Sequence, residues 1–331
     1  LKEVPVSQIH RSGRRVTKNK WVYKLKFSST GELLRRKSRL VACGYSQVEG
    51  RSFDAAKLYS PTVRAESFRW ICALWSTSSD PECTIQQYDI PTAFLNAELS
   101  YELYMNTIPG LDATPGTAYR ICKSLYGLRQ SSRNWQDMWA EGLTTECGMK
   151  RSIFDPCLYT RQYRSANGRH RMVWLIIYVD DILICGNRKL VAELSQQIDS
   201  KVVSMKPAGD ENGRIAWFLG QKVTFKMHPD KKKCEMTVTQ EQYIKDGLER
   251  FDLAGITPRR TPENCDVVLG PPTPEEIIVA KKDNFEYRSA IGVLMFLSTR
   301  TRPDIAHAVY LCARYSAGYG KTHITAVKRI W

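Results

Sequence analysis

No apolar run in this sequence approaches the ~20 residues that an α-helix needs to cross a bilayer, which excludes a helical membrane protein. Its ten cysteines stand singly, without a Cys-x-x-Cys pair, and only five histidines accompany them. Neither a disulfide scaffold nor a zinc site is indicated, and reduced thiols inside a cell fit this pattern. The chain also begins without an initiator methionine or an apolar signal core, so we expect a segment of a longer reading frame.

Acidic residues are scarce, because 34 Asp and Glu stand against 49 Lys and Arg, for a formal net charge of +15. The imbalance is concentrated in residues 1–64, which hold fifteen basic and four acidic side chains, a net of +11. Such a local excess is costly to fold unless a polyanion neutralises it, which favours nucleic acid as the partner. A generic solvated surface is the alternative that charge alone leaves open.

Hydrophobic periodicity predicts alternating strands and helices. Residues 21–27 alternate strictly, and a turn at 28–31 with a return strand at 33–42 predicts a hairpin with a basic face. A second hairpin is predicted at 173–185, where two apolar, β-prone runs flank a turn. The order of elements indicates an α+β fold with an antiparallel sheet backed by helices. The other predicted elements are a strand ending at Asp89 and helices over 66–77, 131–146 and 190–202.

The C-terminal part is predicted to hold further helices around a linker. Thr239, followed three residues later by Gln242, has the pattern of a capping box at the start of a helix. Five prolines between residues 258 and 274 indicate the linker. Helical segments are predicted beyond it, at 287–297 and 303–316.

Asp180 and Asp181 stand side by side in the turn of the second hairpin. Two adjacent anions repel each other, and a divalent cation would remove that cost because Mg²⁺ and Mn²⁺ prefer hard oxygen ligands. The alternative is that aspartate simply favours turns. Asp89 ends a predicted strand, and its carboxylate beside the double-Asp turn would complete a two-cation site for phosphoryl transfer. Taken alone, Asp89 also fits a helix N-cap before Pro91.

Short segments of recognisable character follow one another along almost the whole chain, up to Trp331. They are WVYKLK at 21–26, RLVACGYSQ at 39–47, DIPTAFLN at 89–96, LYGLRQ at 125–130, YVDD at 178–181, FLG at 218–220, TQEQYI at 239–244, YRSAIG at 287–292 and TRPDI at 301–305. In order and character they resemble the reverse transcriptase of copia-type (Pseudoviridae) retrotransposons. Each segment is modest alone, and their common order is highly specific.

The resemblance implies an RNA-directed DNA polymerase, in which the primer 3′-hydroxyl attacks the α-phosphate of an incoming dNTP. Asp89 and Asp180 would hold two catalytic Mg²⁺ ions, with Mn²⁺ as a substitute. Asp181 would be the adjacent, supporting carboxylate. No covalent enzyme intermediate is needed.

The resemblance also implies contacts to the nucleotide and to the primer. Phe94 corresponds to an aromatic that crowds the sugar 2′ position, although a core phenylalanine is the alternative. Gln130 would line the dNTP site, and Arg39 or Lys37 would reach the triphosphate from the first hairpin. The implied primer and template contacts are Tyr178, Val179 and Gly220.

The implied architecture is a right hand. Fingers would take residues 1–65 and 97–135, the palm 66–96 and 136–235, and the thumb 236–262. Residues 263–331 would be a linker and the start of a connection towards an RNase H domain that the segment lacks. The implied partners are an RNA template, a primer, the RNA/DNA heteroduplex, dNTPs and the integrase and RNase H parts of a Pol polyprotein, with no membrane. The implied location is the cytoplasm, within a virus-like particle, or the nucleus.

Two other functions stay open on the sequence. A decayed copy of the element would bind nucleic acid without catalysis, although Asp89, Asp180 and Asp181 are all present. An RNA-dependent RNA polymerase would share the palm, but Phe94 opposes it because an RNA polymerase needs room for the 2′-hydroxyl. Residues 55–59 and Ala97 depart from the family pattern, which puts detail of the fingers in doubt and leaves the metal site untouched.

Overall fold

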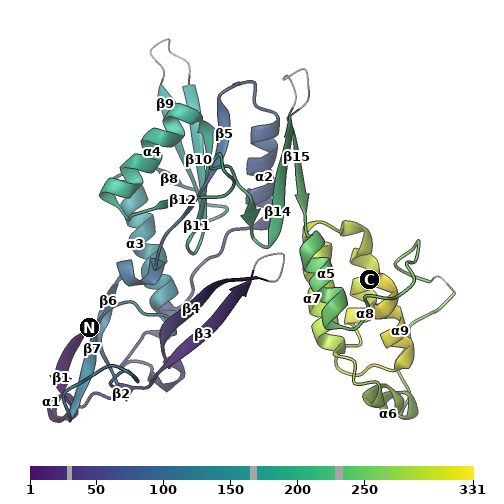
Figure 1. The fold of residues 1–331 in the computed structure, drawn as a ribbon, viewed down its shortest axis with the longest axis horizontal. Helices are drawn as coiled ribbons and strands as arrows, with labels where there is room; N and C mark the ends of the chain where they lie inside the picture. The colour runs from purple at the N-terminus through teal and green to yellow at the C-terminus, as the bar shows by residue number, and fades with distance from the viewer. Residues whose placement is uncertain (28–31, 165–169, 228–233, 265) are drawn as a thin grey trace. The chain divides into compact units, whose positions relative to one another are not determined.

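The structure is a computed structural model that describes residues 1–27, 32–164, 170–227, 234–264 and 266–331. The chain divides into two compact units, Leu1–Ile215 and Ala216–Trp331. Figure 1 follows their elements along the chain. Within the described ranges, no helix combines the length and the apolar character needed to cross a membrane.

The first unit is built on a six-stranded antiparallel sheet in the order β12-β5-β11-β10-β9-β8. Three helices pack against this sheet or its edge, which confirms the predicted α+β fold (Figure 1). The facing apolar stretches of the two central strands, 173–177 of β10 and 182–185 of β11, are buried except for the half-buried Trp174, as packing on both faces requires. The elements are β5 (Cys83–Asp89), β8 (Lys150–Arg151), β9 (Leu158–Arg164), β10 (His170–Tyr178), β11 (Asp181–Asn187), β12 (Lys206–Ala208), α2 (Ala65–Ser76), α3 (Ser131–Thr145) and α4 (Arg188–Lys201).

Helices α2 and α4 cover opposite faces of this sheet. On one face, Trp70 of α2 meets Trp174 of β10 edge to face, with ring centroids 5.9 Å apart. On the other face, Arg161 Nη1 of β9 donates to Gln197 Oε1 of α4 at 2.6 Å. Arg161 pairs with Val173, the neighbour of Trp174, and successive strand residues point to opposite faces. The sheet is therefore buried from both sides, which leaves its strand ends and turns as the accessible positions.

Two smaller sheets complete the first unit. The predicted basic hairpin is confirmed as a two-stranded ladder of β3 and β4, and its turn at 28–31 lies outside the described residues. A four-stranded sheet in the order β1-β7-β6-β2 was not predicted from the sequence. The elements are β1 (Lys2–Pro5), α1 (Val6–Arg11), β2 (Val16–Thr17), β3 (Asn19–Phe27), β4 (Leu33–Ala42), β6 (Glu98–Met105), β7 (Thr117–Lys123) and the 3₁₀ turns η1 (Gly44–Ser46), η2 (Ala55–Lys57) and η3 (Ala93–Asn96).

The second unit joins a three-stranded sheet to helices that share one apolar core. Residues such as Leu294, Val309 and Val327 are almost inaccessible in that core. The elements are β13 (Trp217–Phe218), β14 (Gln221–Met227), β15 (Cys234–Thr239), α5 (Glu241–Arg250), α6 (Pro274–Lys282), α7 (Tyr287–Arg300), η4 (Pro303–Ile305), α8 (Ala306–Ala313) and α9 (Lys321–Ile330).

The capping box predicted at Thr239 is wrong. Thr239 pairs with Lys222 as the last residue of β15, so its backbone belongs to the sheet. Helix α5 begins two residues later and has no side-chain cap. A capping box forms instead at α6, where Thr273 and Glu276 each accept a hydrogen bond from the other's backbone amide, at 3.2 and 2.8 Å. The capping-box spacing is present both at Thr239 and at Thr273, and Thr239 does not form the box because its backbone is paired in a strand.

The boundary between the two units falls after Ile215, inside the segment 136–235 that the sequence assigned to the palm. The division into fingers, palm, thumb and connection stays a prediction.

Candidate active site

The β10–β11 hairpin closes with a two-residue turn that carries the first of the two adjacent aspartates. Tyr178 pairs with Asp181 across the hairpin, so Val179 and Asp180 form the turn and Asp181 begins β11. Val179 has a φ of 60°. Two-residue hairpin turns favour positive φ, which suits Gly or Asn, so a β-branched valine here is held in a strained conformation.

Hydrogen bonds from two directions hold the carbonyl groups of this turn. The Ile90 amide, just beyond β5, donates to the Asp180 carbonyl oxygen at 2.9 Å. The Trp135 indole Nε1, from α3, donates to the Val179 carbonyl oxygen at 2.7 Å. The backbone of Asp180 is therefore positioned by the neighbouring strand and helix as well as by its own hairpin.

Asp89 lies directly opposite Asp181 in the antiparallel ladder of β5 and β11. Residues opposed in this way share a face of the sheet, with Cβ atoms about 4.5–5.5 Å apart. Like charges in such a pair destabilise the sheet, so the pair does not serve folding. The N-cap alternative for Asp89 does not hold, because the next helical turn, η3, follows Thr92 instead.

Burial and mutual repulsion raise the pKa of both hairpin carboxyls. Burial is the largest cause of the raised pKa of Asp180, and the charge of Asp89 adds to it, while Lys37 and Arg39 act in the opposite direction. Burial, and then the charges of Asp180 and Asp89, raise the pKa of Asp181 to about 6. The three carboxyls therefore form one electrostatic cluster, in which positive charge would be strongly favoured.

The donor chemistry of this cluster fits a hard divalent cation, because carboxylate oxygens are what Mg²⁺ and Mn²⁺ prefer. In the part of the chain that the structure describes, no three His, Cys, Asp or Glu side chains converge closely enough to hold an ion. The fit therefore rests on residue type, burial and repulsion.

Basic side chains of β4 face the carboxyl cluster. Lys37 and Arg39 are two residues apart and share one face of the hairpin, with Lys24 directly opposite Lys37. Both side chains lie close enough to Asp180 to lower its pKa. Placing two lysines opposite each other is unfavourable in a sheet unless an anion lies between or above them.

An aromatic pair connects this basic face to the carboxylates. The Phe94 ring lies 4.9 Å from the Tyr126 ring, and the Arg39 guanidinium lies 5.5 Å from the centre of the Tyr126 ring. Burial raises the pKa of Tyr126, and the charge of Asp180 raises it further. Phe94 is half-buried and packs on Tyr126, and both its nucleotide contact and the core alternative stay predictions.

The loop at 125–130 is docked closely on the end of β4. The Ala42 amide donates to the Tyr126 carbonyl oxygen at 2.8 Å. Gly127 has a φ of 90°, and a Cβ there would collide with the Ala42 carbonyl oxygen and lie 2.6 Å from Val41 Cγ1. Only glycine fits this position, because the backbone is left-handed here and β4 lies too close to leave room for a Cβ.

Residues 7–264 match the family described as reverse transcriptase (RNA-dependent DNA polymerase). The chain belongs to the reverse transcriptase family. It is 36% identical over 326 residues to the retrovirus-related Pol polyprotein from transposon TNT 1-94 of Nicotiana tabacum, and 32% identical over 313 residues to that from transposon RE2 of Arabidopsis thaliana. These alignments cover 96% and 94% of this chain but 23% and 20% of the relatives, so it spans under a quarter of their length. The resemblance to copia-type retrotransposon reverse transcriptases is confirmed.

A solved structure, described as the foamy viral protease-reverse transcriptase dRH in complex with ds DNA, shares 9% sequence identity with this chain. The likeness covers 98% of this chain and 46% of that one, with a TM-score of 0.40. The fold is therefore assigned from the sheets and helices described above and not from this likeness.

Not every predicted site residue of this reverse transcriptase domain faces the carboxylates. Gln130 is 4% exposed, and its amide accepts from Gln47 Nε2 at 3.0 Å and donates to the Ser52 carbonyl oxygen at 3.0 Å. Its burial leaves little of the Gln130 side chain accessible to a nucleotide. Tyr178 and Val179 are 38% and 37% exposed, so both are open to a ligand.

Gly220 belongs to the second unit of the reverse transcriptase domain. It forms the β13–β14 turn with Leu219, and their φ values are 72° and 51°. Phe296 packs beside it, because a Cβ on Gly220 would lie 3.4 Å from the Phe296 ring. The primer contact of Gly220 stays a prediction.

Two residues near the carboxylates were missed in the sequence. Tyr126 belongs to the LYGLRQ segment, and an aromatic residue beside a glycine in a loop is a signal that could have indicated a site residue. The apolar periodicity of 131–146 predicts a buried ring for Trp135, which the structure shows, but it does not predict the hydrogen bond of the indole nitrogen. Periodicity identifies a buried face and is silent on hydrogen bonds.

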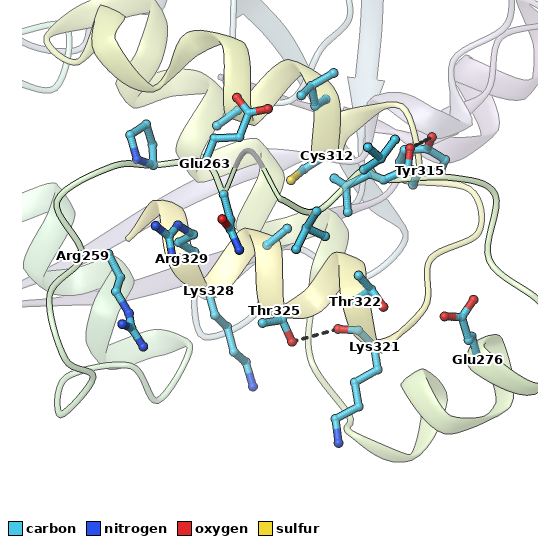
Figure 2. A pocket seen from close by; sticks show the side chains of 18 of the residues that line it. Arg259, Glu263, Glu276, Cys312, Tyr315, Lys321, Thr322, Thr325, Lys328 and Arg329 are labelled. Atoms are coloured by element: carbon cyan, nitrogen blue, oxygen red, sulfur yellow. Dashed lines mark hydrogen bonds between the residues drawn. The ribbon is translucent and has the colours of Figure 1, made fainter.

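The second unit of the reverse transcriptase domain holds a cavity of about 1250 Å³, between residues 255–264 and helices α6, α8 and α9 (Figure 2). Figure 2 shows Arg259, Lys321 and Lys328 reaching out from its lining. Oε2 of Glu263, one of the lining acids, lies 2.8 Å from His307 Nδ1, within hydrogen-bond distance. The cavity is lined by apolar, basic and acidic groups, and the candidate active site is placed at the paired carboxyls of the first unit.

Proposed function

We propose that this reverse transcriptase domain extends a primer on an RNA template by adding dNTPs. The observation that carries the proposal is the carboxyl cluster: Asp89 and Asp181 face each other across two strands, with Asp180 in the adjoining turn. Rigid strands hold these groups, as positional catalysis needs. Family membership makes nucleotide addition the chemistry to expect of that cluster.

Asp89, Asp180 and Asp181 would hold two Mg²⁺ ions, or Mn²⁺ in their place. When bound, such cations neutralise charge on the attacking and leaving oxygens of a phosphoryl transfer. The raised pKa values of Asp180 and Asp181 support this assignment, because they show how unfavourable the negative charges are without a cation.

The basic face of β4 would bind the triphosphate. Lys37 and Arg39 approach the carboxyls from the hairpin, and a guanidinium suits phosphate oxygens because it donates to two of them at once. Phe94 stands on the same side through its contact with Tyr126, where it would crowd a sugar 2′-hydroxyl. The nucleotide would then lie between the carboxyls and this face. The role of Gln130 in the dNTP site stays a prediction.

The template and primer would be held mainly through their phosphates. The excess of basic residues in 1–64 favours backbone contacts, which are insensitive to sequence and weakened by salt. Exposed Tyr178 and Val179, beside the carboxyls, would lie at the primer terminus. In the parent Pol polyprotein, the integrase and RNase H parts would be the protein partners.

Primer extension on an RNA template in Mg²⁺, with either dNTPs or NTPs, tests the proposal. We expect the wild-type chain to use dNTPs and reject NTPs, and Phe94→Ala to lower that discrimination at least tenfold by opening space for the 2′-hydroxyl. Phe154→Ala, at an exposed position, is the control and should leave discrimination unchanged. Use of NTPs by the wild type would indicate an RNA polymerase, and no extension with either set would indicate a nucleic-acid-binding remnant.

A further inference from the structure

The catalytic turn has a conformation that its own sequence does not favour. Val179 is β-branched and adopts a φ of 60°, in the left-handed region. Non-glycine residues in sparsely populated regions are strained, and they persist only where the surrounding structure holds them. Two apolar strands fix the start and end of the turn, and the peptide groups between them need a further constraint.

Trp135 supplies that constraint. Its indole nitrogen donates to the Val179 carbonyl oxygen at 2.7 Å, which is short for an N–H···O hydrogen bond. The peptide group that accepts this bond joins Val179 to Asp180, so its orientation sets the direction in which the Asp180 side chain leaves the backbone. The Trp135 side chain is buried and cannot give up the bond to water without losing packing.

We propose that Trp135 is a positioning residue for the carboxyl cluster, acting through the hydrogen bond from its indole nitrogen to the Val179 carbonyl. Its importance for catalysis rests on the proposed function. The hydrogen bond itself and its effect on the turn do not.

The position of Trp135 also links the two sides of the site. Helix α3 starts at Ser131, whose Oγ donates to the Leu125 carbonyl oxygen at 2.7 Å. The same helix is anchored at Asn134, whose Nδ2 donates to Ser124 Oγ at 3.1 Å. One rigid turn of helix therefore connects the loop that carries Tyr126 to the turn that carries Asp180. A helix fixed at its start is a better anchor for the turn than a free side chain.

The chain contains a matched control one helical turn away. Trp139 belongs to the same helix and is also buried, and its ring centroid lies 5.8 Å from that of Trp135. Its indole nitrogen is buried and has no hydrogen-bond partner in the described part of the chain. Replacing either residue with phenylalanine removes similar ring volume, but only Trp135→Phe removes a bond to the turn.

Hydrogen–deuterium exchange of the turn tests the positioning role without reference to activity. In Trp135→Phe we expect the amides of residues 178–181 to exchange at least tenfold faster than in the wild type, because the Val179 peptide group is released. In Trp139→Phe they should exchange at the wild-type rate, although both variants lose packing. Equal exchange in the two variants would overturn the proposal.

Single-nucleotide incorporation under single-turnover conditions tests the consequence for catalysis. A shift of about 1 Å in a reacting group can cost up to 10²-fold in rate, and we expect Trp135→Phe to slow incorporation about tenfold. Binding of dNTP and of template–primer should stay within twofold of wild type, and Trp139→Phe should match the wild type. An equal slowing in both variants would overturn the proposal, whereas inactivity of the wild type would refute the proposed function and leave the exchange result to decide the role of Trp135.

Discussion

Asp180→Asn is expected to abolish primer extension, with a loss of at least about 10³-fold in the rate of incorporation. Asparagine keeps the size of the side chain and one oxygen, so the hairpin keeps its shape. It removes one negative charge from the cluster, and with it a ligand of the proposed divalent cations. Relief of the repulsion from Asp89 should leave the fold at least as stable as before.

The measurement for Asp180→Asn is single-turnover incorporation, together with template–primer binding by fluorescence anisotropy. Binding should stay near the wild-type value, because the proposed phosphate contacts involve basic residues elsewhere. Asp137→Asn is the matched control, since Asp137 is half-exposed and pairs with Arg133 in a helix-surface ion pair at 2.7 Å. Such pairs contribute little. Wild-type activity in Asp180→Asn would remove Asp180 from the site.

Gly127→Ala is expected to destabilise the first unit by about 4 kcal/mol, in the range that marks backbone strain combined with a clash. The new methyl group would meet the Ala42 carbonyl oxygen and Val41, and neither backbone nor a branched side chain can move away cheaply. The φ of 90° adds strain for any residue with a Cβ. The loop would have to leave β4, and Tyr126 would leave with it.

A second glycine separates the effect of the steric clash from that of the left-handed backbone. Gly110 has a φ of 83°, and nothing lies within 4 Å of a Cβ added there. Gly110→Ala should therefore cost only the left-handed backbone term, about 1–2 kcal/mol. Urea unfolding of both variants, followed by circular dichroism through the transition of the first unit, gives the comparison. Equal losses would mean that the close approach of the loop to β4 contributes nothing.

The central part of the fold could be predicted from the sequence because its signals are local. Long apolar runs at 173–185 specify buried strands, and the interruption between them specifies a turn. The β1-β7-β6-β2 sheet gave no such signal, because β1 and β2 pair with strands far along the chain and β6 and β7 carry mixed exposed and buried positions. Local patterns do not show which distant strand will be a neighbour.

The candidate site could be located from the sequence but not resolved. A strand-end Asp89 and an Asp pair in a turn are visible as residues, whereas the register of the hairpin is not. The structure places Asp181, and not Asp180, opposite Asp89. Which of the two aspartates faces Asp89 is set by the register of the hairpin, which the sequence does not show. A shift of the register by one residue would move every side chain of the strand to the other face of the sheet. Packing of the sheet against its helices fixes the register.

The hydrogen-bond partners of buried polar side chains could not be predicted from the sequence either. Gln130 was predicted to face a nucleotide, and it is found with both ends of its amide bonded inside the protein. Periodicity in 131–146 accounts for the buried ring of Trp135 and not for its hydrogen bond to the β10–β11 turn. Residue type and period cannot reveal which partner a buried polar atom will find.

Asp89 and Asp180 are proposed to act as one site although Asp89 ends β5 and Asp180 lies in the β10–β11 turn. A double-mutant cycle of Asp89→Asn, Asp180→Asn and the double variant, measured by single-turnover incorporation on an RNA template, tests this most directly. Groups that act as a unit are strongly non-additive. We predict that each single variant loses at least about 10³-fold and that the double variant is no slower than the worse single one. Wild-type rates in Asp89→Asn, or losses that multiply in the double variant, would contradict the account.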